Sequence, residues 1–116
     1  MRHQNKKITL GRKTAGRRSL MANLAESVIL YEKVKTTKAK AKAVQSVVEK
    51  LVTKAKQNNL TARREIMKQL YTENAVKKLM EQLGKKYADR KGGYTRVTVV
   101  KNRVGDGAEE AIIEFV

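Results

Sequence analysis

Hydrophobic residues recur at helical spacing along most of the chain and alternate with polar residues near its end. The first helical stretch carries on one face Leu20, Leu24, Val28 and Tyr31, with Met21 beside them. This spacing predicts a helix over residues 14–31, and Thr14 is expected to cap its first turn.

The second stretch is the most regular amphipathic pattern in the sequence. One face over residues 38–57 carries Val44, Val48, Leu51, Val52 and Ala55. We therefore predict a helix there, with Thr37 as its N-cap. A weak alternation over residues 32–36, immediately before it, predicts a short strand.

Two shorter helices are expected after Asn58 and Asn59, which interrupt the apolar pattern. The first starts near Thr61 and turns Ile66 and Leu70 inward. The second starts near Glu73 and carries on one face Val76, Leu79, Met80 and Leu83. Met67 and Met80 are both predicted to lie in the core, because methionine fills irregular apolar gaps.

The last quarter of the chain has the pattern of a β-hairpin. Residues 94–104 (YTRVTVVKNRV) and 110–116 (EAIIEFV) are rich in β-branched residues, and Gly105–Gly107 is a tight connection between them. Two strands alone are marginally stable, so the hairpin needs the helices as backing. We therefore predict an α+β fold: helices packed on a small sheet containing a C-terminal antiparallel hairpin.

The predicted domain spans residues 14–116 and follows an extended basic arm, residues 1–13. Ile8 and Leu10 are the arm's only aliphatic residues after Met1, so no helical pattern is present. From Met1 to Arg18 the chain has seven Lys or Arg and no acidic residue. Such a segment can thread between phosphates and become ordered on binding.

The net charge of the chain indicates which class of binding partner to expect. The 116-residue chain has 27 Lys and Arg against 11 Asp and Glu, a formal net charge of +16. Ordinary small domains carry a net charge of roughly 2–8. A surplus of this size repels itself, and a polyanion relieves the repulsion. The composition therefore favours nucleic-acid binding.

Sequence features of catalysis are sparse. His3 is the only histidine and has no acidic residue near it in sequence, so a solvated residue or a nucleic-acid contact explains it better than catalysis. There is no cysteine, no metalloprotease motif and no phosphate-binding glycine loop. Glu109, Glu110 and Glu114 could form a metal-dependent nuclease site, but Glu114 is better explained as an outward strand residue beside a basic neighbour.

We therefore expect no enzymatic activity, catalytic residue, metal or other cofactor, and no small-molecule substrate. No apolar run reaches the ~20 residues of a membrane span, so no membrane partner is expected. Aromatic residues make up 4% of the chain and tryptophan is absent. Single-strand binders use aromatic side chains to stack bases. The composition instead favours recognition of folded RNA by shape, or of a duplex backbone.

Several short stretches resemble one family throughout the chain. They are Met1-Arg2-His3, Gly11-Arg12, Arg17-Arg18 leading into Leu20-Met21-Ala22-Asn23-Leu24, Lys35-Thr36-Thr37 with Lys40-Ala41-Lys42, Arg90-Lys91-Gly92-Gly93-Tyr94-Thr95-Arg96, and Gly105-Asp106-Gly107-Ala108. In this order they are similar to ribosomal protein seventeen of the bacterial large subunit. The Gly-Gly-Tyr-Thr-Arg and Thr-Thr-x-x-Lys-Ala-Lys blocks are the most specific.

The resemblance implies an α+β protein of the cytoplasmic large ribosomal subunit, bound to large-subunit ribosomal RNA (rRNA) near the mouth of the peptide exit tunnel. Its partners would be that rRNA and neighbouring large-subunit ribosomal proteins, in a structural role without catalysis. The RNA-binding residues expected in the arm and first helix are Arg2, His3, Lys6, Lys7, Arg12, Lys13, Arg17 and Arg18. A second patch comprises Lys35, Thr36, Lys38, Lys40 and Lys42, and a third comprises Arg90, Lys91, Tyr94 and Arg96.

Some interpretations stay open at this point. Tyr94 is as well explained by a strand residue covering the core as by stacking on a nucleotide. The main rival function is a small architectural DNA-binding protein that uses residues 94–104 as a basic ribbon. A nuclease is a rival of a different class. A lipid-binding basic helix is a third, which we discount because the apolar stripe over residues 38–57 is needed for a core.

Overall fold

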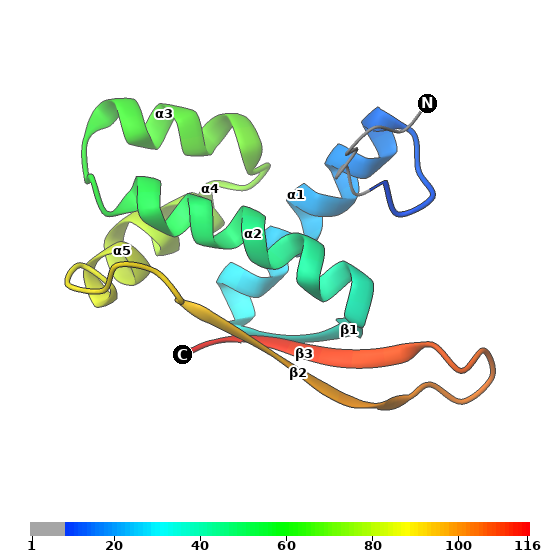
Figure 1. The fold of residues 1–116 in the computed structure, drawn as a ribbon. Helices are drawn as coiled ribbons and strands as arrows, with labels where there is room; N and C mark the ends of the chain where they lie inside the picture. The colour runs from blue at the N-terminus through cyan, green and yellow to red at the C-terminus, as the bar shows by residue number, and fades with distance from the viewer. Residues whose placement is uncertain (1–8) are drawn as a thin grey trace, which may run out of the picture.

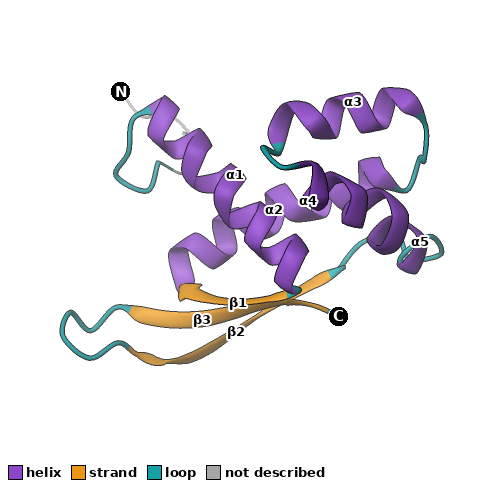
Figure 2. Ribbon diagram, turned by 180° about the vertical axis from the view of Figure 1, so that it is seen from behind, coloured by secondary structure: helices purple, strands orange, loops and turns teal. Residues whose placement is uncertain are grey.

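A three-stranded antiparallel sheet and a layer of helices on one of its faces make up the fold (Figures 1 and 2). The computed structural model describes residues 9–116. The helices are α1 (Thr14–Tyr31), α2 (Lys38–Ala55), α3 (Leu60–Gln69), α4 (Glu73–Lys78), the π-helical segment η1 (Leu79–Leu83) and α5 (Gly84–Lys86). The strands are β1 (Lys33–Thr37), β2 (Thr95–Asn102) and β3 (Glu109–Phe115). This confirms the predicted α+β class.

The sheet has the strand order β1-β3-β2, so the last strand of the chain is its centre. Both pairings are antiparallel, and Val34 of β1 lies opposite Ile113 of β3. The short strand predicted before the second helix is confirmed, one residue later than expected. It supplies the third strand that the hairpin needs for stability. The hairpin tip extends beyond the helices (Figure 1), and β2 carries a bulge between Val99 and Lys101.

Helix α2 forms the centre of the core, as its pattern predicted. It packs against all three strands and against α1, α3 and η1. Its predicted stripe is at most 1% exposed at every position: Val44, Val48, Leu51, Val52 and Ala55. Thr37 caps the helix as expected, because its hydroxyl accepts a hydrogen bond from the Lys40 N–H at 3.4 Å.

The buried face of α1 was predicted only in part. Tyr31 is 74% exposed, so its assignment to the apolar face was wrong. The buried stripe is instead Ala22, Ala25, Val28 and Ile29, whereas Leu20, Met21 and Leu24 are half-buried. Nine of the twelve residues from Leu20 to Tyr31 are apolar, so spacing alone could not choose between neighbouring faces. Thr14 is not the cap either: Lys13 takes the N-cap position and makes no side-chain cap bond.

The three segments from Glu73 to Lys86 follow one another without a break. All four apolar residues predicted for one face of this region are buried. Gly84 lies against α2, where an added Cβ would be 3.1 Å from the Ala55 carbonyl oxygen. Met80 is buried as predicted, but Met67 is 50% exposed and that prediction was wrong.

A buried carboxylate fixes the turn between α3 and α4 against α1. Glu26 is 8% exposed, and its Oε1 accepts hydrogen bonds from the backbone N–H of Tyr71 and, at 2.8 Å, of Thr72. Thr72 takes the N-cap position of α4 and makes no side-chain cap bond itself. Glu26 therefore supplies the acceptor that this helix start needs.

We predict that Glu26→Ala lowers the free energy of unfolding by about 1–3 kcal/mol, because it leaves two inward-facing N–H groups without an acceptor. Urea denaturation of the purified protein measures this. Glu26→Gln keeps an oxygen at the same position and should lose less. A Glu26→Ala protein as stable as the wild type would show that the turn does not depend on this carboxylate.

Candidate nucleic-acid interface

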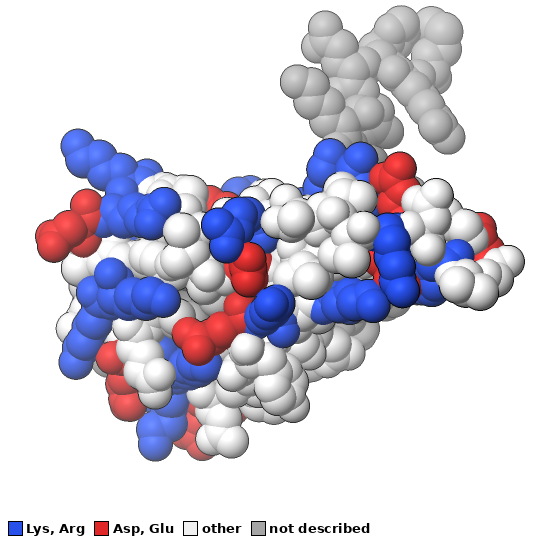
Figure 3. Space-filling model, turned by 90° about the horizontal axis from the view of Figure 1, so that it is seen from below, with Lys and Arg blue, Asp and Glu red and all other residues white. Residues whose placement is uncertain are grey.

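The acidic side chains are largely used within the fold. Six ion pairs occur within residues 9–116: Lys35–Glu110, Lys38–Glu109, Lys54–Glu65, Lys78–Glu32, Arg96–Glu114 and Arg103–Asp106. Four of them involve the C-terminal hairpin. On the sheet side of the molecule, acidic and basic side chains are interleaved (Figure 3). The sheet therefore carries far less surplus positive charge than the chain average.

These ion pairs divide the second predicted patch into cations that have a carboxylate partner and cations that have none. Lys35 lies 3.2 Å from Glu110 and Lys38 lies 3.2 Å from Glu109, so both charges are balanced. Thr36 is half-buried opposite Ala111. Lys40 and Lys42 form no ion pair within the part of the chain that the structure describes. These two cations remain available to an external anion.

The first patch lies at the start of α1. Arg12 donates to the Leu10 carbonyl at 2.9 Å, and Arg17 donates to the Arg12 carbonyl at 3.2 Å. Neither residue, nor Lys13 or Arg18, pairs with a carboxylate among residues 9–116. The first turns of α1 and α2 contain no acidic residue. Cations at a helix N-terminus oppose the helix dipole, so a bound phosphate would stabilise both helix starts.

The start of α1 lies against the middle of α2. A hollow of about 340 Å³ lies between Arg17 and Arg18 of α1 and Ala43 and Ser46 of α2. Lys42 lies one helical turn before Ser46. The predicted residues Arg2, His3, Lys6 and Lys7 lie outside the described residues.

The third patch is a loop held at both ends by tyrosines. Tyr94 is 2% exposed, and its ring centroid lies 5.2 Å from that of Tyr87. Its hydroxyl donates to the Arg90 carbonyl at 3.2 Å, and Lys56 donates to the same hydroxyl at 3.1 Å. The structure therefore supports the core interpretation of Tyr94, because its ring has no surface on which a base could stack.

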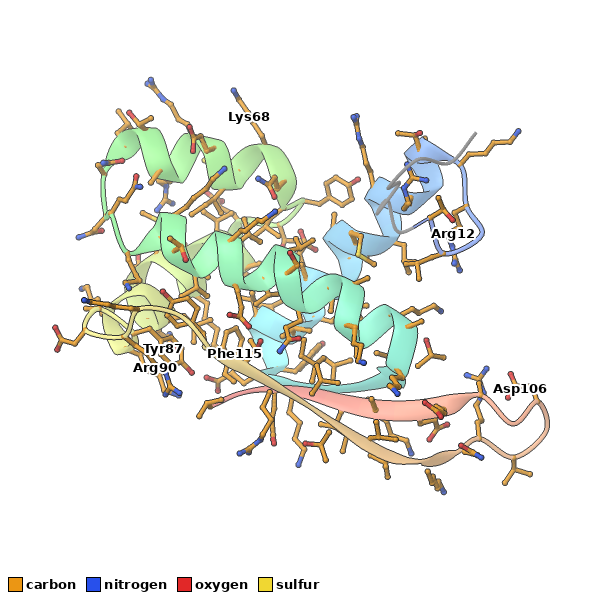
Figure 4. All side chains as sticks on the ribbon, in the orientation of Figure 1. Arg12, Lys68, Tyr87, Arg90, Asp106 and Phe115 are labelled. Carbon is orange, nitrogen blue, oxygen red and sulfur yellow. The ribbon has the colours of Figure 1, made fainter. Side chains whose placement is uncertain are left out.

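Between those anchors the loop presents its cations. Gly92 and Gly93 have φ of +141° and +62°, which side chains disfavour, so both glycines are needed for this path. Arg90 and Lys91 are exposed on it, and Arg90 lies beside Tyr87 and Phe115 near the end of the sheet (Figure 4). The structure thus places Arg90 and Lys91 where an external anion can reach them.

Arg96 differs from the rest of the third patch. Its Nη2 donates to Glu114 Oε1 at 2.7 Å, and this hydrogen bond lowers the pKa of Glu114. The prediction that Glu114 is an outward strand residue beside a basic neighbour is confirmed. At the hairpin tip, hydrogen bonds from Arg103 and from the Ala108 N–H lower the pKa of Asp106 to about 2. The arginines of the hairpin are therefore matched by its own acidic residues.

Sequence reasoning missed the cations of α3. Arg64 and Lys68 are four residues apart, so they share an exposed face, whereas Ile66 and Leu70 are buried. Lys68 lies on the side of α2 opposite the sheet (Figure 4). The i, i+4 spacing of two exposed cations was the signal that could have found them. Glu65, three residues before Lys68, pairs with Lys54.

Two other kinds of feature, a metal site and a membrane-spanning helix, are absent from the described residues. No group of three or more His, Cys, Asp or Glu within them could hold a metal ion. None of the helices over residues 9–116 is both long and apolar enough to span a bilayer. A small α+β body with unpaired cations at the starts of two helices is typical of proteins that bind a polyanion.

Comparison with known proteins identifies the family to which this chain belongs. The sequence matches the family described as Ribosomal protein L17 over residues 20–116, and the chain belongs to that family. It is 49% identical over 116 residues to the "Large ribosomal subunit protein bL17" of Solibacter usitatus, covering all of this chain and 77% of the relative. The protein of the same name from Wolinella succinogenes is 43% identical over 116 residues, which is the full length of both chains.

A third relative of that name, from Desulfitobacterium hafniense, is 48% identical over 107 residues, covering 92% of this chain and 96% of the relative. The family resemblance inferred from the short motifs is confirmed. Membership in a ribosomal protein family makes the chain a structural protein rather than an enzyme, as predicted.

Proposed function

We propose that this chain is a structural constituent of the large ribosomal subunit that binds and stabilises folded large-subunit rRNA near the mouth of the peptide exit tunnel. Family membership supports the subunit and, through it, the bacterial cytoplasm. The observation that carries RNA binding is the set of cations at the starts of α1 and α2 that have no carboxylate partner among the described residues. Neighbouring large-subunit ribosomal proteins are its proposed protein partners.

The rival DNA-binding role is weakened by the hairpin. A basic ribbon would need cations that are free to contact phosphates, but Arg96 and Arg103 are paired with Glu114 and Asp106. Phosphate contacts fix the position of a protein on a nucleic acid and carry no sequence information themselves. The unpaired cations of the helix starts suit such a positioning role on folded rRNA.

Two double variants test the proposal with equal losses of charge. Lys40→Gln with Lys42→Gln removes unpaired cations, and Lys35→Gln with Lys38→Gln removes cations already balanced by Glu110 and Glu109. Filter binding to large-subunit rRNA over a range of salt concentrations gives the log–log salt slope, which counts neutralised phosphates. We expect the first variant to reduce the slope by about 0.7–0.9 for each lost contact, and the second to reduce it less.

The slope is the deciding quantity, because the second variant also leaves two carboxylates unpaired and can weaken binding through repulsion alone. Equal slope changes in both variants would contradict the assignment of the interface. Stronger binding to duplex DNA than to rRNA under the same salt would contradict the proposed partner.

The arm is tested by removing residues 1–8, which takes away Arg2, Lys6 and Lys7. Because α1 begins at Thr14, we expect the thermal midpoint to stay the same. The salt slope should fall by up to about 2.1–2.7, three phosphate contacts. The full-length chain with these three residues changed to glutamine is the matched control and should show the same loss. An unchanged slope would mean that the arm does not contact phosphate.

A further inference from the structure

An apolar groove lies on the side of the helices that faces away from the sheet. It has a volume of about 420 Å³ and is lined by α1, α2 and the end of α3. Met21, Val47 and Leu70 contribute apolar surface, and Arg18, Lys68 and Tyr71 also line it. None of its lining residues is acidic. In Figures 1 and 2, the end of α3 and the first half of α1 lie on the same side of α2.

The backbone around Tyr71 holds its ring at this groove. Glu26 accepts a hydrogen bond from the Tyr71 N–H, so the turn is anchored through the main chain and the side chain is not needed for it. The Tyr71 side chain is 62% exposed, and Met67, one turn earlier, is 50% exposed. Among the four tyrosines, Tyr71 is an exposed ring that lies beside cations and a groove, whereas Tyr87 and Tyr94 are buried.

The groove is continuous with the basic surface. The 340 Å³ hollow at the start of α1 shares three of its lining residues, Arg18, Met21 and Val47. Its far end is lined by Leu10 and Arg17. A strand of nucleic acid bound at the start of α1 can therefore follow one trough to Tyr71.

We propose that this groove binds one unpaired nucleotide of the rRNA, with its base on the Tyr71 ring and its phosphates near Arg18 and Lys68. The proposal rests on the proposed function and adds a site to it. The groove suits an occupant with a flat apolar body and negative charge, which describes a nucleotide. A segment of another basic protein would bring positive charge against two cations that no acidic lining residue offsets. Base stacking tolerates any base, so the site needs no sequence preference.

Three single variants test the stacking. Tyr71→Ala should raise the Kd for large-subunit rRNA by about 5- to 150-fold, the range that loss of one stacked base produces. Tyr71→Phe keeps the ring and should bind within about twofold of the wild type. Tyr31→Ala is the matched control, because Tyr31 is also exposed (74%) but lies at the other end of α1, and it should not change Kd.

The position of the base is read directly by photo-crosslinking. Large-subunit rRNA containing 4-thiouridine is irradiated with the full chain, and the crosslinked peptides are identified by mass spectrometry. We expect a crosslink within residues 65–77, which include Met67 and Tyr71, and its loss in Tyr71→Ala.

Three results would overturn the groove proposal. They also distinguish a failure of the nucleotide site from a failure of the proposed function. If the wild type binds rRNA, Tyr71→Ala binds equally well and crosslinks fall only at the helix starts, rRNA binding stands and the nucleotide site does not. If Tyr71→Ala weakens only association with another ribosomal protein, the groove is a protein-docking site. If the wild type does not bind rRNA at all, both proposals are wrong.

Discussion

Burial of one face of α2 is the interaction on which the rest of the molecule depends. This helix packs on all three strands, and it also contacts α1, α3 and the π-helical segment. Val48 and Val52 are completely buried, and Gly84 reaches the Ala55 carbonyl closely enough that a side chain would have to push the two helices apart. Because α2 positions α1 and α3, it also positions the basic start of α1 and the groove that is lined by α1, α2 and the end of α3.

The distribution of charge follows from this arrangement. The central strand β3 lies between β1 and β2, and its glutamates pair with Lys35 and Arg96 on either side. Glu26 is buried and serves the turn before α4. Four of the eleven acidic residues lie in the C-terminal hairpin and pair there with basic side chains. The cations at the start of α1, and Lys40 and Lys42 of α2, have no such partner among the described residues.

The structural features that could be predicted from the sequence are those that depend on one local and unambiguous pattern. The α2 stripe, the Thr37 cap and the hairpin are local features, and all are confirmed. The α1 face was ambiguous because nine of the twelve residues over Leu20–Tyr31 are apolar. The pairing of Lys35 and Lys38 with Glu110 and Glu109 depends on the β1–β3 register, which joins residues more than 70 positions apart and leaves no local signal. For the same reason the groove, formed by three helices, could not be seen in the sequence. The sequence left two interpretations of Tyr94 open, and its packing against the Tyr87 ring decides for the core.

Lysine reactivity within the assembled particle tests the central claim most directly. The free protein and intact large subunits are each treated briefly with an acetylating reagent, and the modification of every lysine is measured by mass spectrometry. We predict that Lys13, Lys40 and Lys42 react in the free protein and are strongly protected in the subunit, whereas Lys33 and Lys101 of the sheet are protected much less. Reactive Lys13, Lys40 and Lys42 in the subunit, with protected lysines on the sheet, would place the rRNA on the opposite face and contradict it.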